Sequence, residues 1–285
     1  MGDRPVSVII PTYNRAEKLM ASVDSVLRQT HSALEVIVVD DGSTDHTEEA
    51  VAAITERDNR VRYYRMPENG GVSRARNAGV AEAGYDLIAF NDSDDLWHPE
   101  KLEKQLAYLD AHPEDVLVYC AYKVDIPGGG IIRIPTAEEE RDTLEGEIFY
   151  YLLLRPAIGT PTILMRRDLF LQSGGFDPSY PVMEDWEFTI RISRTGPVGF
   201  VDEILLTVEA TAADRKSCVS DRKTQLAHYE ARCMLLAKYL DEIKEIGQFD
   251  LYAGEILHKA ERDGLTDIVK GMMMEQLARR TIGNA

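Results

Sequence analysis

Acidic side chains gather in one short segment of this 285-residue chain, Asn91-Asp92-Ser93-Asp94-Asp95. Carboxylates so close together repel one another unless a cation lies between them. Carboxylate oxygens suit hard cations such as Mg²⁺ and Mn²⁺, which take one or two protein carboxylates and complete their coordination with phosphate oxygens and water. The segment therefore indicates a divalent cation that is shared with a diphosphate ligand.

Two further polar clusters, Pro11-Thr12-Tyr13-Asn14 and Asp40-Asp41-Gly42-Ser43, also follow predicted strands directly. Taken singly, each cluster has an ordinary explanation, because Asp, Asn, Ser and Gly are common turn and helix-cap residues. Asp45 is likewise a natural N-cap for the next helix. Three such clusters at corresponding strand ends are harder to explain as turns alone, and together they predict one binding site.

An alternating pattern of strands and helices must position these clusters. Apolar runs predict strands at Val6 to Ile10, Val36 to Val39, Val61 to Tyr64 and Leu87 to Phe90, and the segments between them have helical spacing. The pattern is typical of an α/β fold, with a mostly parallel central sheet and helices on both faces. Ligands bind at the carboxyl ends of the strands in such sheets, where the three clusters lie.

Residues 101–215 have a less regular pattern. Strands at 116–124 and 131–134 predict a hairpin around the triple glycine at 128–130. A further strand is predicted at 162–165, and a helix at 184–194.

The pattern is helical from about residue 221 to the end. An apolar stripe recurs at helical spacing on the first of these helices, at Leu226, Tyr229, Cys233, Leu236 and Leu240. The stripe is too short for a convincing coiled coil, so we expect it to pack on the preceding domain. A homodimer through the C-terminal helices is the alternative.

Positive charge for a phosphorylated ligand is supplied by the segment from Asn69 to Asn77, where a helix is predicted to begin. Arg74 and Arg76 are both candidates for phosphate. Residues two apart on a helix do not share a face, so we expect only one of them to enter the site. We favour Arg76.

Composition excludes several classes of protein. A formal charge of −17 disfavours nucleic acid as a partner and docking on anionic lipid. The three cysteines, Cys120, Cys218 and Cys233, have neither zinc-ligand spacing nor the pattern of a disulfide framework. No signal-like start and no long apolar run appears, so the chain is expected to be cytoplasmic and to lack a transmembrane segment.

Four motifs together resemble the family 2 glycosyltransferases of the GT-A fold. They are Val6-Ser7-Val8-Ile9-Ile10-Pro11-Thr12-Tyr13-Asn14-Arg15, Val38-Val39-Asp40-Asp41-Gly42-Ser43-Thr44-Asp45, Arg76-Asn77-Ala78-Gly79 and Asp92-Ser93-Asp94-Asp95. The resemblance is dense over residues 5–100 and continues to about 210 through Gly174-Gly175-Phe176-Asp177 and Glu184-Asp185-Trp186. It implies a Rossmann-like GT-A catalytic domain at 1–215, with a donor half at 1–100 and an acceptor half at 101–215. A C-terminal helical region at 216–285 would follow.

The resemblance also implies which residues bind the nucleotide-sugar donor. These are Pro11, Thr12, Tyr13, Asp41, Asn69, Arg76 and Asp92. Pro11 and Tyr13 would line the base, Asp41 would accept a hydrogen bond from the base edge, and Asp92 would face the ribose. Asp94 would be the principal ligand of Mn²⁺ or Mg²⁺, with Asp92 as the second candidate ligand, and the metal would neutralise charge on the departing nucleoside diphosphate.

Asp185 is implied to be the base that takes the proton from the acceptor hydroxyl in an inverting transfer. Without the resemblance, the acidic pair Glu184-Asp185 would be explained as a helix start stabilised by the dipole. Many relatives add a histidine to the metal site after a later strand, near Leu205 to Glu209. This chain has none there, and Glu209 is a speculative substitute.

The predicted function is metal-dependent transfer of a sugar, favoured as a UDP-sugar, to a hydroxyl of a glycan or lipid-linked acceptor in polysaccharide biosynthesis. Such an acceptor leaves room for a peripheral membrane contact. A sugar-phosphate nucleotidyltransferase is the nearest alternative, but it would normally carry a glycine-rich loop where this chain has Pro11-Thr12-Tyr13-Asn14-Arg15. A non-catalytic nucleotide-sugar-binding scaffold is the third hypothesis, which the combination of donor carboxylates and candidate base disfavours.

Overall fold

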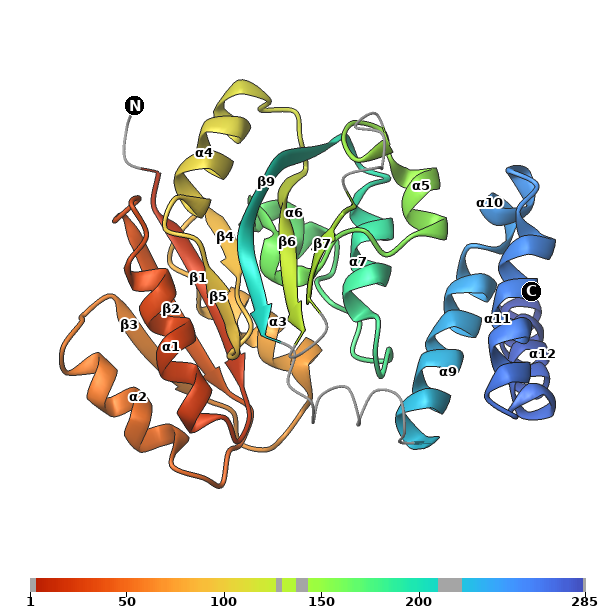
Figure 1. The fold of residues 1–285 in the computed structure, drawn as a ribbon, viewed down its shortest axis with the longest axis horizontal. Coiled ribbons are helices and arrows are strands. Elements are labelled where there is room, and N and C mark those ends of the chain that lie inside the picture. Colours follow the sequence, from red (N-terminus) through yellow and green to blue (C-terminus); the bar gives the residue numbers. More distant parts are fainter. Residues whose placement is uncertain (1–3, 127–129, 137–142, 210–221, 284–285) are drawn as a thin grey trace.

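The computed structural model of the chain describes residues 4–126, 130–136, 143–209 and 222–283 (Figure 1). Its centre is a nine-stranded sheet with the order β3-β2-β1-β4-β8-β6-β9-β5, and β7 pairs with β6 beside this path. The strands are β1 (Val6–Thr12), β2 (Leu34–Asp40), β3 (Val61–Arg65), β4 (Leu87–Phe90), β5 (Asp95–Trp97), β6 (Leu117–Ile126), β7 (Gly130–Ile134), β8 (Leu164–Arg166) and β9 (Val198–Glu209).

The helices of the body around the sheet are α1 (Ala16–Leu27), α2 (Thr47–Thr55), α3 (Val72–Glu82), α4 (Lys101–Ala111), α5 (Phe149–Leu154), α6 (Arg167–Gln172) and α7 (Glu184–Ile192). The C-terminal helices are α9 (Arg222–Lys238), α10 (Leu240–Glu245), α11 (Phe249–Arg262) and α12 (Thr266–Gly283). They stand beside the body as a separate layer, next to α5 and α7 (Figure 1).

Strands β1 to β4 form a parallel half-sheet, with β1 between β2 and β4 and β3 outside β2. The other half is mixed. Strand β8 is antiparallel to both β4 and β6, β6 is parallel to β9, and β5 is antiparallel to β9. The predicted α/β class is confirmed, and the antiparallel strands are confined to the half beyond β4.

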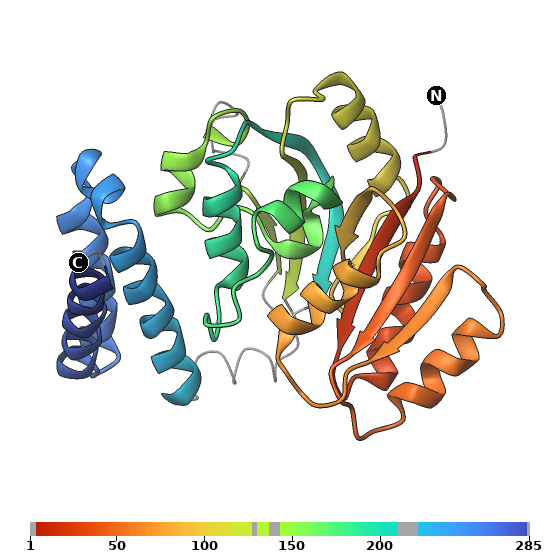
Figure 2. The same ribbon diagram turned by 180° about the vertical axis from the view of Figure 1, so that it is seen from behind.

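Helices cover both faces of the sheet because side chains of its strands alternate between two apolar cores. Ile10 of β1 packs in the core that holds α1, α2 and α4, which lie on the near face in Figure 1. Its neighbour Ile9 packs in the opposite core with residues of α3, α6 and α7, which cover the face seen in Figure 2. The sheet is therefore buried on both sides, as its continuous β-branched runs require.

The predicted strands and helices of the first 90 residues all form within a few residues of their expected limits. The hairpin is also confirmed, since β6 pairs antiparallel with β7, although Pro127-Gly128-Gly129 lies outside the described residues. The strand expected at 162–165 begins only at Leu164, because Thr160–Thr162 forms a 3-10 turn with Pro161 inside it. Strand β5 and helix α4 were not predicted.

The apolar stripe of α9 is covered within the chain. Tyr229, Cys233 and Leu236 are buried in the same continuous core as α7, and Leu226 and Leu240 pack against it. The Tyr229 hydroxyl also bonds Asp263 after α11 at 2.6 Å. Of the three consecutive methionines on α12, Met273 is buried and Met274 is 70% exposed. In the described parts of the chain, no helix has the length and apolar character needed to cross a bilayer.

Helix α3 lies unusually close to the sheet because Gly79 faces it. A β-carbon built on Gly79 would come within 2.5 Å of Ile9 Cγ2 and 2.9 Å of Val39 Cγ2. Both neighbours are β-branched side chains in a packed core, so neither can move away easily. The glycine thus fixes the distance between α3, which carries Arg76, and strands β1 and β2.

We predict that Gly79→Ala lowers the free energy of unfolding by about 1–3 kcal/mol, because the added methyl group overpacks this contact. Urea denaturation followed by circular dichroism would measure the change. Gly254→Ala is the matched control, since a β-carbon there has no neighbour within 4 Å on α11. The control should gain up to about 1 kcal/mol from helix propensity. Equal effects in the two variants would contradict the packing argument.

Candidate active site

All three polar clusters meet at one cavity of about 330 Å³ at the carboxyl ends of β1, β2 and β4. Its lining residues are Pro11, Thr12, Tyr13, Arg15, Asp41, Val72, Ala75, Arg76, Asp92, Ser93 and Asp94. Seven of the predicted site residues are among them. Asn69 is exposed on the loop before α3, and Asp185 begins α7; neither lines this cavity.

The first two clusters are tied together by Asn14, which adopts a left-handed backbone conformation with φ of 53°. Its side-chain oxygen accepts hydrogen bonds from the backbone N–H groups of Thr44 (2.8 Å) and Asp45 (3.3 Å), and its own N–H donates to Ser43 Oγ at 2.9 Å. Asparagine tolerates this conformation better than most residues. The loops after β1 and β2 are therefore held as one unit.

Asp41 fixes the start of α3. Its two carboxylate oxygens accept hydrogen bonds from the backbone N–H groups of Gly70 (2.7 Å) and Gly71 (2.8 Å). Gly71 has φ of 86°, which glycine adopts without strain, and it directly precedes α3. The carboxylate predicted to meet a nucleobase thus also has a structural role, which composition and spacing did not indicate.

Arg76 joins the acidic cluster to the start of α7. The residue is only 4% exposed. Its guanidinium donates hydrogen bonds to Asp92 Oδ1 at 2.8 Å and to Glu184 Oε1 at 2.7 Å. Burial alone would lower the pKa of this arginine, but Asp92 and Glu184 raise it above its usual value. Arg74 is exposed, whereas Arg76 lines the cavity.

Asp185 stands in the first turn of α7, after Met183 in the left-handed conformation. One of its oxygens accepts the N–H of Trp186 at 2.7 Å. Burial, with the neighbouring Glu184 carboxylate, raises the pKa of Asp185 to about 7, while Arg76 opposes the rise. Such a carboxyl exchanges its proton near neutral pH. Trp186 is a core residue, and its ring N–H donates a hydrogen bond to the Leu152 carbonyl.

The three aspartates of the acidic cluster differ in environment. Asp95 is 4% exposed, and burial together with Asp92 and Asp94 raises its pKa to about 9. Asp94 faces the cavity and pairs with Arg15, with Lys18 Nζ at 3.7 Å from Asp94 Oδ2. Asp92 pairs with Arg76. The crowding inferred from sequence is therefore relieved by three cationic side chains and by protonation of Asp95.

The donor set fits a cation that relies on its ligand for much of its coordination. The described residues include no group of three or more His, Cys, Asp or Glu side chains that could hold a metal ion. Asp94 and Asp92 are both at the cavity, and Mg²⁺ and Mn²⁺ accept one or two carboxylates when phosphate oxygens supply other positions. The side chain of Glu209 lies outside the described residues.

Two residues that line the cavity each have one buried polar atom without a hydrogen-bond partner among the described residues. Thr12 Oγ1 and Arg76 Nε form no hydrogen bond with any described residue, although both atoms are shielded from solvent. Buried donors and acceptors without partners are rare and costly in folded proteins. Both residues line the cavity, although these two atoms are themselves shielded from solvent.

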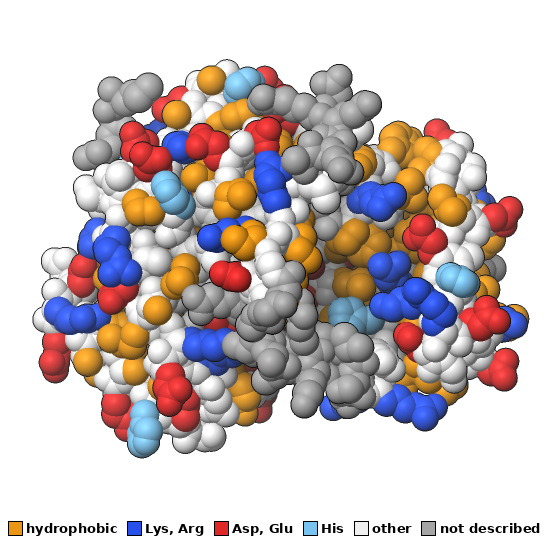
Figure 3. Space-filling model, viewed as in Figure 1, with side chains coloured by type: hydrophobic (Ala, Val, Ile, Leu, Met, Phe, Trp, Pro, Cys, Tyr) orange, Lys and Arg blue, Asp and Glu red, His pale blue; other side chains and the backbone are white. Residues whose placement is uncertain are grey.

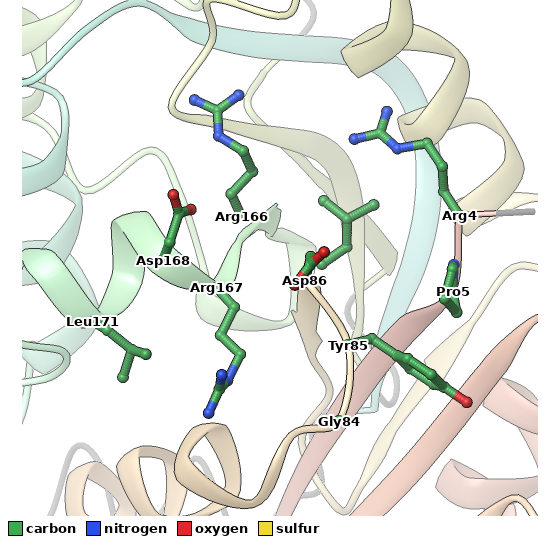
Figure 4. Close-up of a pocket in the computed structure, with 10 residues that line it drawn as sticks. Arg4, Pro5, Gly84, Tyr85, Asp86, Arg166, Arg167, Asp168 and Leu171 are labelled. Carbon is green, nitrogen blue, oxygen red and sulfur yellow. The ribbon is translucent and has the colours of Figure 1, made fainter.

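A second cavity, of about 670 Å³, lies at the opposite, amino edge of β1 and β4 (Figure 4). It contains Arg4, Arg166 and Arg167 among its lining residues. These guanidinium groups already have partners: Arg4 pairs with Asp110, Arg166 bonds the Pro113 carbonyl and Arg167 bonds the Val80 carbonyl. The chemistry-bearing motifs are all at the other edge, so the smaller cavity is the candidate site.

Sequence reasoning missed three residues of the site. Arg15 and Lys18 pair with Asp94, and Tyr122 on β6 lies close enough to Asp185 and Asp95 that burial and both carboxylates raise its pKa to about 12. Arg15 follows the first polar cluster directly, which is a signal that could have identified it. Nothing in the sequence marks Lys18 or Tyr122.

Comparison with known proteins places the chain in a family. The model of Glycosyl transferase family 2 matches residues 7–173. An uncharacterized glycosyltransferase of Rickettsia typhi is 32% identical over 233 residues, which are 79% of this chain and 69% of that protein. An uncharacterized glycosyltransferase of Rickettsia felis is 28% identical over 84% of this chain. The matched region spans only 39% of the length of that protein.

Solved structures share the fold. S. aureus TarS in complex with UDP-GlcNAc superposes with a TM-score of 0.64 at 19% identity, over 97% of this chain and 90% of that one. The mannosyltransferase PcManGT from Pyrobaculum calidifontis, in complex with GDP-Man and Mn²⁺, superposes with a TM-score of 0.58 at 20% identity. The match covers 97% of this chain and 75% of that one. The chain belongs to glycosyl transferase family 2, and it is a glycosyltransferase with the GT-A fold.

We predict that Arg76→Met lowers the free energy of unfolding by about 3 kcal/mol at pH 8, because it leaves buried carboxylates without their cation. The loss should shrink at pH 5. Arg76 holds down the pKa of Asp185, so without Arg76 this carboxyl takes up a proton more readily as pH falls, and its repulsion of the neighbouring acidic side chains decreases. Urea denaturation at both pH values measures this. Arg74→Met is the exposed control, and an equal loss there would contradict the assignment.

Proposed function

We propose that this chain is a metal-dependent inverting transferase that passes a sugar from a UDP-sugar to a hydroxyl of a glycan or lipid-linked acceptor. The observation that supports it best is the buried guanidinium of Arg76, which joins Asp92 of the acidic cluster to Glu184 beside Asp185. This contact brings a donor-binding group and a candidate base to one place. Inversion requires both, on opposite sides of the sugar that moves.

The donor half of the proposal uses the cavity-lining residues. Pro11 and Tyr13 would flank the base, Thr12 Oγ1 offers an unpartnered polar atom, and Asp41 retains lone pairs for a base N–H beside its bonds to Gly70 and Gly71. Asp92 would face the ribose. Asn69 is a weaker candidate, because it is exposed on the loop beside the cavity.

Arg76 and Asp94 both line the cavity, and Arg76 would supply positive charge for the diphosphate there. Asp94, with Asp92 as the second candidate, would hold Mn²⁺ or Mg²⁺. A cation there supplies positive charge to the departing nucleoside diphosphate. The structural neighbour PcManGT is described with Mn²⁺, which supports this choice by fold analogy.

Asp185 would remove the proton from the acceptor hydroxyl. A general base works best when its pKa is near the working pH, and burial raises the pKa of Asp185 to about 7. Glu184 holds the start of α7 against Arg76, so the position of Asp185 is set by a buried ion pair. The acceptor hydroxyl would approach from the half formed by residues 101–215, with residues 216–285 as a helical support.

A uridine nucleotide is the favoured donor, and guanosine is the competing one. TarS is described with UDP-GlcNAc and PcManGT with GDP-Man, so structural likeness alone does not choose between them. An Asp41 carboxylate can accept the N–H of a uracil edge, which is the chemical reason for the preference.

We predict that UDP-sugars raise the melting temperature only with Mn²⁺ present. Ligand at 100 times its Kd adds about 2.7 kcal/mol of stability, a shift of roughly 5 °C for a chain of this size. Asp94→Ala should abolish the Mn²⁺-dependent part of the shift. Asp250→Ala, on the exposed start of α11, is the control. A screen of UDP, GDP and dTDP sugars identifies the base, and a full shift in Asp94→Ala would contradict the metal assignment.

We predict that Asp185→Asn retains donor binding but loses transfer by about 100-fold or more. In the wild type, transfer should rise with pH and level off above about 7, because only the deprotonated Asp185 accepts a proton. UDP release in the presence of a glycan or lipid-linked acceptor measures the rate. Asp250→Asn, in the first turn of α11, is the matched control. Full transfer by Asp185→Asn would refute the base assignment.

A further inference from the structure

We propose that Arg15 and Lys18 neutralise Asp94 in the cation-free protein and move to the donor diphosphate when a divalent cation binds Asp94. The proposal rests on the proposed function, and it assigns two ligand-binding residues to the site. Arg15 lies in the loop after β1, and Lys18 lies in the first turn of α1.

The side chains of Arg15 and Lys18 both form an ion pair with the same oxygen of Asp94. Asp94 Oδ2 accepts a hydrogen bond from an Arg15 terminal nitrogen and lies 3.7 Å from Lys18 Nζ. Asp94 lines the cavity, so the two cations lie beside the carboxylate that an ion in the cavity would bind. Asp94 therefore has cationic neighbours in the structure, and metal binding must compete with them.

A divalent cation can displace Arg15 and Lys18 from Asp94. The side chains of Arg15, Lys18 and Asp94 are 40%, 36% and 24% exposed, and ion pairs this accessible to water contribute little net stability. Arg76 is the contrast, with a side chain that is 5% exposed and two carboxylate partners. We infer that Arg76 stays in place while Arg15 and Lys18 exchange partners.

The charges also require new partners for the displaced side chains. A cation on Asp94 would repel Arg15 and Lys18, and the nearest anionic groups in a loaded site would be the phosphates of the donor. Space for a side-chain movement is present, because Arg15 lines both the site cavity and a neighbouring cavity of about 480 Å³, which Lys18 also lines. The same two residues would thus oppose metal binding alone and favour metal binding with nucleotide.

The exchange predicts that removing either cationic side chain changes the affinities for Mn²⁺ and for UDP in opposite directions. In Arg15→Gln and Lys18→Gln, Mn²⁺ without nucleotide should bind about two- to fivefold more tightly than in the wild type, because a competing ion pair is gone. UDP in saturating Mn²⁺ should bind about tenfold more weakly, because a charged hydrogen-bond donor to phosphate is lost. Electron paramagnetic resonance of free Mn²⁺ gives the first affinity, and isothermal titration calorimetry gives the second.

Arg74→Gln controls for the general effect of removing one positive charge, since Arg74 is exposed on α3 near the site. Arg15→Lys, which keeps the charge, should lie close to the wild type in both measurements. Equal or weaker Mn²⁺ binding in the glutamine variants, or the same tightening in Arg74→Gln, would overturn the exchange. If the wild type bound neither UDP nor GDP with Mn²⁺, the proposed function itself would fail and the exchange with it.

Discussion

The structure of the site depends on one buried guanidinium. Arg76 is enclosed between Asp92, Glu184 and the ring of Phe176, whose centroid lies 5.3 Å from the guanidinium carbon. Removing these charges from water is costly, and only close pairing with hydrogen bonds offsets that cost. Because Asp92 follows β4 and Glu184 begins α7, the pair sets the distance between segments that are 92 residues apart in sequence (184 − 92). Gly79 then sets how near Arg76 can come, by allowing α3 to approach the sheet.

A second layer of support comes from the C-terminal helices. Glu187, on α7, is fully buried and accepts hydrogen bonds from Arg191 of the same helix and from Lys238 of α9 at 2.6 Å. These donors keep the pKa of Glu187 below its usual value despite burial. Helix α7 is therefore held by Arg76 at Glu184 and, three residues later, by α9 at Glu187. Figure 3 shows lysine and arginine side chains on the near side of these C-terminal helices, where they face the recess beside the body.

Most of the parallel half-sheet could be predicted from the sequence, because β1 and β2 are largely β-branched runs, β4 is a short apolar run, and polar clusters follow all three. The mixed half could not. Strand β5 has only three residues, beginning at the last aspartate of the acidic segment, and it forms because β9 is available as an antiparallel partner. Helix α4 buries Lys101 over the Trp97 ring at 3.9 Å, so its apolar face includes a charged residue that a hydrophobic pattern counts as surface. Such pairings depend on tertiary contacts and leave no periodic signal.

The acidic cluster illustrates the same limit at the level of single residues. Sequence identified crowded carboxylates and a need for positive charge, and helix geometry indicated that only one of Arg74 and Arg76 would enter the site. It did not separate the three aspartates, since that depends on burial: Asp95 is enclosed and favours its proton, Asp92 is tied to a fixed arginine, and Asp94 remains partly exposed among exchangeable cations. Only a carboxylate that is accessible and loosely paired can exchange its partners for a metal ion. The environment, rather than the spacing of the motif, therefore assigns Asp94 its candidate role.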